Sequence, residues 1–276
     1  MAKRFLAQRS RRLFMRAPRV HILRLEGVIG SGGRFQKGLS LEALDGAIED
    51  AFDGKRLKAV ALVINSPGGS PAQSALIHDR IRALADENDI PVVAFVEDVA
   101  ASGGYWIACA ADEIYAQAAS IVGSIGVVSG GFGFVEAIAK LGIERRLHTA
   151  GDNKGMLDPF LPEQNDEVER LKRLQAELHT LFIDHVKARR SVRLNDIDDD
   201  LFSGAFWAGE QARRRGLIDG LGDVRQVMRG RFGENVKFRT VKPERGLLSR
   251  FGLGSRLAAS VAGELEARSL WSRFGL

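Results

Sequence analysis

Three short segments rich in glycine and serine carry the residues of this chain that could do chemistry. Their sequences are NSPGGS at 65–70, AASGGY at 100–105 and GDNKGMLDPF at 151–160. Each comes directly after, or between, apolar stretches that have the length of a buried strand. Sites in open α/β sheets form beyond the carboxyl ends of the strands. We therefore expect these segments to lie at such a site.

Ser102 in the second segment is a candidate nucleophile. It lies between a predicted buried strand and a predicted helix, with the small residues Ala100 and Gly104 two positions away on either side. A serine at a sharp strand-to-helix turn requires small neighbours, although Ala100 stands where hydrolases have glycine. The N-terminus of the following helix would also favour developing negative charge. Helix capping explains a serine here equally well, so both interpretations stay open.

The paired glycines Gly68 and Gly69 are candidates for an oxyanion hole. Glycine adopts backbone conformations that other residues avoid and leaves its N–H group unobstructed. Such N–H groups can hold the oxygen that becomes negative during acyl transfer. An ordinary tight turn is the alternative, and the sequence PGG by itself favours the turn.

A serine nucleophile requires a base, and the sequence offers two candidates. His148 is the one histidine at the end of a predicted strand. Lys154 lies among Gly, Met, Leu and Phe residues rather than on a charged helix face. A lysine acts as a base only if burial or positive neighbours lower its pKa, and a solvated loop lysine is the alternative. The remaining histidines lie within a predicted strand or on helices, where an exposed or capping role is usual: His21, His78, His179 and His185.

The elements that must position these residues alternate between strands and helices. Apolar runs predict strands at 20–28, 58–64, 91–97, 113–117, 143–149 and 236–242. Apolar residues at helical spacing predict helices at 40–53, 71–86, 133–141, 162–190, 206–216 and 222–232, with a turn and a helix at 101–112. The glycine-rich residues 123–133 are predicted to form a loop inside the domain. This alternation implies an α/β fold with a mainly parallel sheet.

Composition excludes several classes of protein. The chain has 276 residues, 45% hydrophobic and 27% charged, which is near the average of globular domains. Its single cysteine, Cys109, excludes a disulfide framework and is too few for structural zinc. The net charge of +5 arises at the ends, because residues 1–20 hold seven Lys or Arg and no acidic residue. Residues 21–242 hold 28 basic and 32 acidic residues, so we expect no nucleic-acid surface.

The charge pattern divides the chain into a basic leader at 1–19, a main domain at 20–242 and a basic, amphipathic tail at 243–276. No stretch reaches about 18 consecutive apolar residues, so no transmembrane helix is predicted. The leader also lacks the apolar run of a secretory signal. It suits an amphipathic helix on an anionic membrane or a solvated segment. We expect a cytoplasmic protein, with peripheral contact at the inner face of the plasma membrane as the alternative.

Four motifs follow one another along the chain: NSPGGS at 65–70, ASGGYW at 101–106, GSIGV at 123–127 and GDNKGMLDPF at 151–160. Together they resemble the signal peptide peptidase A family (peptidase family S49), serine peptidases that use a Ser-Lys dyad. Ser102 precedes Ser124 by 22 positions and Lys154 by 52, which also fits the family. The resemblance covers residues 20–242. That is the size of a single repeat, with both dyad residues on one chain.

The resemblance implies a role for each of these residues. Ser102 would be the nucleophile, Lys154 the general base, and Ser124 would hydrogen-bond the lysine amine and orient it. The oxyanion hole would combine backbone N–H groups from two loops, those of Gly68 or Gly69 with that of Ser102 or Gly103. No metal or cofactor would take part.

The implied fold is the crotonase/Clp-protease type, built of repeated ββα units. Members of the family form homo-oligomeric rings or domes, in which neighbouring subunits help to complete each site. Many members also have an N-terminal membrane anchor, where this chain has its basic leader.

The expected function is a serine endopeptidase that hydrolyses unfolded or released peptides, such as remnant signal peptides. A Clp-type Ser-His-Asp peptidase would need a histidine at the position of Val127, so that alternative is weaker. A crotonase-like acyl-CoA enzyme would use the same N–H groups without the Ser-Lys pair. A catalytically silent, membrane-associated scaffold would keep the dyad only as a vestige.

Overall fold

The structure is a computed structural model that describes residues 17–30, 38–194, 200–241 and 269–276. Most of the predicted leader, and residues 243–268 of the predicted tail, lie outside the described residues. Within these four ranges, no helix combines the length and the apolar composition needed to cross a membrane.

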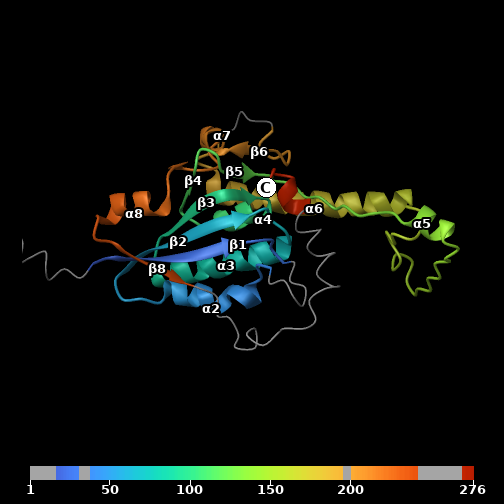
Figure 1. The fold of residues 1–276 in the computed structure, drawn as a ribbon, viewed down its shortest axis with the longest axis horizontal. Coiled ribbons are helices and arrows are strands. Elements are labelled where there is room, and N and C mark those ends of the chain that lie inside the picture. Colours follow the sequence, from blue (N-terminus) through green and yellow to red (C-terminus); the bar gives the residue numbers. More distant parts are fainter. Residues whose placement is uncertain (1–16, 31–37, 195–199, 242–268) are drawn as a thin grey trace, which may run out of the picture.

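In the described part of the chain, eight strands form a mainly parallel sheet (Figure 1). The strand order is β6-β5-β3-β2-β1-β8, and β4 pairs with β3 and β7. Of these pairings only β5 with β6 is antiparallel. The α/β class with a mainly parallel sheet is therefore confirmed. The strands are β1 (Arg19–Glu26), β2 (Leu57–Ser66), β3 (Val92–Ala101), β4 (Glu113–Ala116), β5 (Ile121–Gly123), β6 (Phe206–Ala208), β7 (Gly220–Leu221) and β8 (Lys237–Val241).

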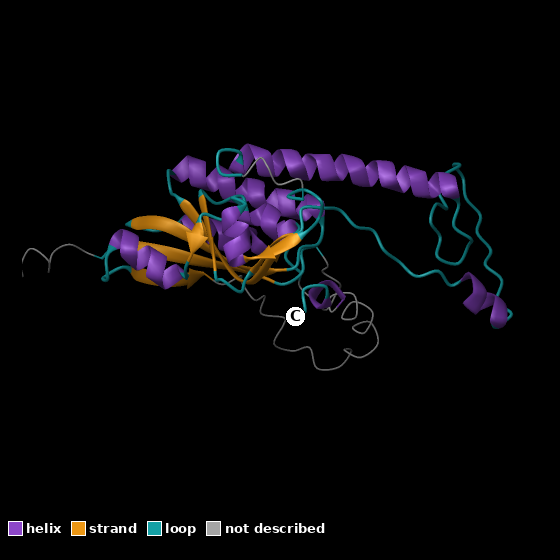
Figure 2. Ribbon diagram, turned by 90° about the horizontal axis from the view of Figure 1, so that it is seen from above, coloured by secondary structure: helices purple, strands orange, loops and turns teal. Residues whose placement is uncertain are grey.

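Helices cover both faces of the sheet. Helices α2, α3, α4 and α6 contribute to the larger core on one face, and α8 packs on the other face (Figure 2). The helices are α2 (Leu41–Phe52), α3 (Pro71–Asn88), α4 (Gly103–Ala108), α5 (Val135–Lys140), α6 (Asn165–Arg190), α7 (Gly209–Arg214) and α8 (Val224–Phe232). Each of these lies within or close to a helix that the sequence predicts.

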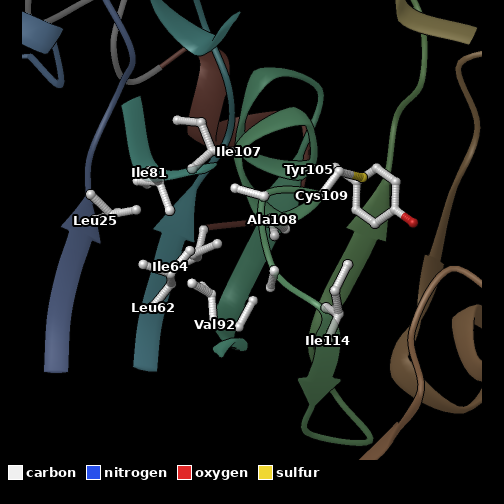
Figure 3. Close-up of a cluster of buried hydrophobic side chains, with 14 of the residues drawn as sticks. Leu25, Leu62, Ile64, Ile81, Val92, Tyr105, Ile107, Ala108, Cys109 and Ile114 are labelled. Carbon is white, nitrogen blue, oxygen red and sulfur yellow. The ribbon is translucent and has the colours of Figure 1, made fainter. Parts of the chain in front are cut away.

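Alternate residues of the central strands face the two helix layers, because successive side chains of a strand point to opposite faces. Ile64 of β2 belongs to the same buried cluster as Ile81 of α3 and Ile107 of α4 (Figure 3). Its neighbour Val63 lies in the opposite cluster with Met228 of α8. Since both faces are covered, β2 is a continuous apolar run in the sequence rather than an alternating one.

Four segments depart from the sequence prediction. Strands β5, β6 and β7 are not predicted, because two or three residues are too few to show an alternating pattern, and residues 206–208 of β6 are predicted as the start of a helix. Residues 143–149 are predicted as a strand, but they form no regular structure and all are exposed. They lie away from the sheet, so no strand is available to pair with them. That prediction is wrong.

Residues 127–164, which we call the arm, leave the sheet after β5 and return at the start of α6. The arm contains α5 and stands away from the sheet in both views (Figures 1 and 2). No residue between positions 128 and 166 is buried. Large apolar side chains are nevertheless exposed there: Val128, Phe132, Phe134, Leu141, Ile143, Leu147 and Leu161.

Residues 269–276 contact the sheet beside the end of β3. Phe274 is only 8% exposed and packs with Val99 and Ala101 on the sheet face that also carries α8. The ring of Phe206 meets the ring of Phe274 edge-on at 5.0 Å between centroids. This C-terminal segment therefore covers apolar surface next to Ala101, the residue that precedes Ser102.

Candidate active site

Ser102 lies at the junction between β3 and α4 in a backbone conformation that is rare for serine. Its φ is 51° and its ψ is −123°. Its N–H group donates to the carbonyl oxygen of Gly123 at 2.8 Å, and its own carbonyl oxygen accepts from Tyr105 at 2.9 Å. A positive φ at a residue other than glycine stores strain, and such residues concentrate at functional sites. A sharp strand-to-helix turn of this kind presents the nucleophile in serine hydrolases.

The capping interpretation of Ser102 does not hold, because its side chain makes no capping hydrogen bond to α4. Two other serines show what capping looks like in this fold. Ser40 accepts a hydrogen bond from the N–H of Ala43 at 3.3 Å, and Ser70 accepts one from Gln73 at 3.4 Å. The hydroxyl of Ser102 is therefore not used to begin its helix.

The paired glycines lie directly against this turn. A Cβ atom on Gly68 would be 2.8 Å from the Cβ atom of Ser102 and 2.9 Å from the nitrogen of Gly103. A Cβ atom on Gly69 would be 2.1 Å from the carbonyl oxygen of Ile29. Both glycines also have positive φ, at 102° and 143°. Only glycine fits this approach between the two loops.

Two of the four N–H groups considered for an oxyanion hole already have a hydrogen-bond acceptor within the fold. The N–H of Ser102 donates to Gly123, and that of Gly68 donates to the hydroxyl of Ser66 at 3.2 Å. The N–H groups of Gly69 and Gly103 have no hydrogen-bond partner among the described residues. Gly69 and Gly103 are neighbours, since the nitrogen of Gly69 would lie 3.4 Å from a Cβ atom on Gly103. These two groups are the ones available to a ligand.

Ser124 lies on the same side of the site as Ser102. It follows β5, in which Gly123 is paired with Ala101 of β3. Ser124 is 6% exposed, has a φ of 54°, and donates its N–H to the carbonyl oxygen of Ala205 at 2.7 Å. The structure thus brings Ser102, the glycine loop and Ser124 together, as three of the four motifs require.

Lys154 is not brought to this group within one chain. It is exposed and lies in the arm, where its N–H donates to the carbonyl oxygen of Gly151 at 3.1 Å. The surrounding contacts are within the arm or with the start of α6. Arg145 binds Asp158 at 2.7 Å, which lowers the pKa of that carboxyl, and Glu167 accepts from the N–H of Leu157 at 2.9 Å.

The alternative base has no better position. His148 is exposed in the same arm and does not end a strand. The expectation that the helical histidines are exposed or capping is wrong for His78, which is 7% exposed, and for the partly buried His185. The ring of His185 stacks on Trp106, and the ring of His78 meets that of His185. The helical pattern by itself does not predict this burial.

Cys109 and possible metal ligands are the remaining side chains that could do chemistry. Cys109 is fully buried behind α4, and burial raises the pKa of its thiol to about 12. It is therefore protonated and inaccessible at neutral pH. Among the residues that the structure describes, no three His, Cys, Asp or Glu side chains are grouped to hold a metal ion.

Comparison with known proteins finds a matching family and related proteases. The model of "Peptidase family S49" matches residues 85–232. The chain is 30% identical to the putative protease slr0021 of Synechocystis, with 95% of each protein covered. It is also 32% identical to the chloroplastic serine protease SPPA of Arabidopsis thaliana, over 75% of this chain and 30% of that protein.

A further relative bears a different name. The whole chain is 50% identical to part of a Brucella abortus protein named Na(+)/H(+) antiporter NhaA. The chain spans 39% of that protein, so the name describes a molecule of which most lies outside the match.

Solved structures show the same fold. One variant of the 1510-N membrane-bound stomatin-specific protease has a TM-score of 0.52 at 18% identity, covering 83% of this chain and all of that chain. Another variant, in complex with a substrate peptide, has a TM-score of 0.53 at 16% identity, covering 93% and 99%. These likenesses confirm the expected fold, and the family match extends over more than half of the sequence. The chain therefore belongs to peptidase family S49.

Proposed function

We propose that this protein is a serine peptidase in which Ser102 is the nucleophile and Lys154 the general base. One observation carries the proposal. Ser102 lies at a strained strand-to-helix turn, and its hydroxyl makes no capping hydrogen bond. Beside it, the N–H groups of Gly69 and Gly103 have no hydrogen-bond partner among the described residues. The two similar protease structures are of variants in which a serine and a lysine, respectively, are replaced by alanine.

The proposed reaction is acyl transfer to serine. Neutral Lys154 accepts the proton of Ser102 while the serine oxygen attacks the peptide carbonyl. The N–H groups of Gly69 and Gly103 stabilise the oxyanion, which is worth about 3–4 kcal/mol per donor in comparable enzymes. Lys154 then protonates the leaving amine, and water hydrolyses the acyl-enzyme in a second cycle. Ser124 directly follows Gly123, whose carbonyl oxygen accepts from the N–H of Ser102. Its hydroxyl would orient the lysine amine.

We infer that Lys154 meets Ser102 of another copy of the chain. The arm carries Lys154 away from its own sheet and exposes a row of large apolar side chains, Phe132 at 82% and Leu141 at 73% among them. Apolar surface of this extent is typical of an interface. A head-to-tail contact in which each arm reaches the next subunit closes into a ring. The site is then complete only in the homo-oligomer.

The substrates proposed are extended peptides, such as unfolded chains or released signal peptides. A cavity of about 920 Å³ lies in the arm beside Lys154, and apolar side chains predominate in its lining. It accepts an apolar side chain of such a peptide. The lining includes Phe132, Phe134, Leu157, Leu161 and Leu171, with Gly155 next to Lys154. Contact of the basic chain ends with the inner face of the membrane would place the enzyme near signal peptides.

A mixing experiment tests the proposal. Ser102→Ala and Lys154→Ala are each expected to abolish cleavage of a panel of fluorogenic peptides. Refolding the two variants together restores activity if nucleophile and base come from different copies. Random mixing then gives about a quarter of the sites both intact residues. No recovery would refute the shared site, and cleavage by either variant alone would refute the dyad.

A further inference from the structure

Three aromatic side chains meet where α3, α4 and α6 pack together. The rings of Trp106 (α4) and His185 (α6) are stacked at 4.4 Å between centroids, with an angle of 10° between their planes. The ring of His78 (α3) meets His185 edge-on, also at 4.4 Å. Nε2 of His185 lies 3.2 Å from the carbonyl oxygen of Trp106. That oxygen accepts, so Nε2 carries the proton in this arrangement.

This cluster is linked directly to the candidate active site. The N–H of Trp106 donates to the carbonyl oxygen of Ser102 at 3.0 Å. Helix α3, which carries His78, begins directly after the Gly68-Gly69 loop and Ser70. The cluster therefore joins the two helices that follow the two loops of the site. The third helix, α6, carries the arm at its other end.

We propose that His78 and His185 are positioning residues, which hold α3 and α4 together in their uncharged form and release them when the cluster is protonated. The inference rests on the proposed function only in that Ser102 is the residue being positioned. The contacts within the cluster stand without it.

The uncharged state follows from what surrounds the two rings. Nδ1 of His78 donates to Asp79 at 2.8 Å, and its Nε2 is buried with no partner among the described residues. A proton added at Nε2 would have no acceptor, which is costly in a buried site. Burial lowers the pKa of both histidines, and burial together with His78 lowers the pKa of His185 to about 4.

Charged groups reach the cluster from two of the three helices. On α3, Asp79 favours the protonated form of His78, whereas Arg82 opposes it. On α6, Arg189 opposes protonation of both histidines. Helix α4 offers the carbonyl and ring of Trp106 but no charged side chain. The two arginines are themselves partly compensated by Asp112, at 3.0 Å from Arg82 and 3.8 Å from Arg189.

Tryptophan fluorescence provides a test that does not depend on catalysis. In a Trp207→Phe, Trp271→Phe background, Trp106 is the one tryptophan left in the chain. Charged imidazole quenches a stacked indole, so emission is expected to fall between about pH 5 and pH 3, because the pKa of His185 is about 4. His185→Gln removes that step, whereas His21→Gln keeps it. His21 is a matched control, because it is buried with a lowered pKa but does not belong to the cluster. Emission that is constant over this range, or a step that survives in His185→Gln, overturns the proposal.

Activity then tests whether the cluster positions Ser102. Protonation of a single base lowers kcat/KM about tenfold per pH unit. Below about pH 5 the wild type is expected to lose activity more steeply than this, while His185→Gln keeps the tenfold dependence. Equal slopes would refute the positioning role even if fluorescence changes. If His185→Gln does not fold, His78→Gln is measured in the same way. Absence of peptidase activity at every pH refutes the proposed function and leaves the fluorescence result to decide whether the cluster takes up protons.

Discussion

Replacing Ser102 by glycine should leave the fold more stable than replacing it by alanine. Ser102 has a φ of 51° and a ψ of −123°, which strains any residue that carries a Cβ atom. Alanine keeps this strain, and glycine releases it. Neither substitution removes a capping bond, because the side chain of Ser102 makes none. The backbone bonds to Gly123 and Tyr105 are also available to both variants.

Two opposing terms set the size of the difference. Releasing a strained backbone conformation stabilises the folded state by about 1–3 kcal/mol. Glycine also gives the unfolded chain more conformational freedom, which offsets about 0.4–1 kcal/mol of that stabilisation. Ser102→Gly should therefore exceed Ser102→Ala by about 1 kcal/mol in the free energy of unfolding. For a chain of this size, that corresponds to a rise of about 2–4 °C in the melting temperature.

Urea unfolding and thermal melting of the two variants measure this difference, and both variants should fail to cleave peptides. Ser191 provides the matched control, because it is exposed and has an ordinary helical φ of −45°. There glycine should be less stable than alanine by about 0.4–1 kcal/mol, because no strain is released and the unfolded chain gains freedom. If glycine is also the less stable residue at position 102, the turn stores no strain and the argument for a nucleophilic serine loses its main support.

Three further outcomes follow from the packing. Gly69→Ala should destabilise the fold by about 3 kcal/mol or more in urea unfolding, because the Cβ atom of the alanine would lie 2.1 Å from the carbonyl oxygen of Ile29. A variant as stable as the wild type would refute this close approach. Arg190→Met should cost about 1–3 kcal/mol in the same assay, since Asp219, 2.7 Å from the buried guanidinium, loses one of its two arginine partners, the other being Arg193 at 2.7 Å. A double variant with Asp219→Asn should recover part of the loss, and unchanged stability of the single variant would contradict the pairing. Because the folded pKa of His185 is about 4, below its ordinary 6.5, the unfolded chain takes up the proton first. The free energy of unfolding of the wild type should therefore fall by about 3 kcal/mol as pH drops from 6.5 to 4. The fall should be smaller in His185→Gln. Equal pH dependence of the two proteins would contradict a lowered pKa at His185.

Local pattern accounts for much of the fold. Apolar runs and helical spacing predict the central strands and the helices α2 and α3, because each element buries a face that its own residues define. The spacing also predicts the long α6, in which the buried residues are Phe182, Val186 and Arg190 near the C-terminal end. The N-cap Ser40 of α2 is an example of such a local interaction, since its partner Ala43 lies only three positions away. The same reasoning fails for residues 143–149. An apolar stretch becomes a strand only when another strand lies beside it, and the arm offers none.

The order of the glycine and serine motifs along the sequence identifies the candidate residues and the family. Which N–H groups remain available could not be predicted, because Ser102 donates to Gly123, and that partner is set by the pairing of β3 with β5. The burial of His185 likewise depends on three helices meeting. The separation of Ser102 and Lys154 depends on where the arm leaves the sheet. The number of residues between them in the sequence does not predict this distance. Sequence determines what each segment can bury, whereas hydrogen-bond partners and exposure depend on which distant segments share a face.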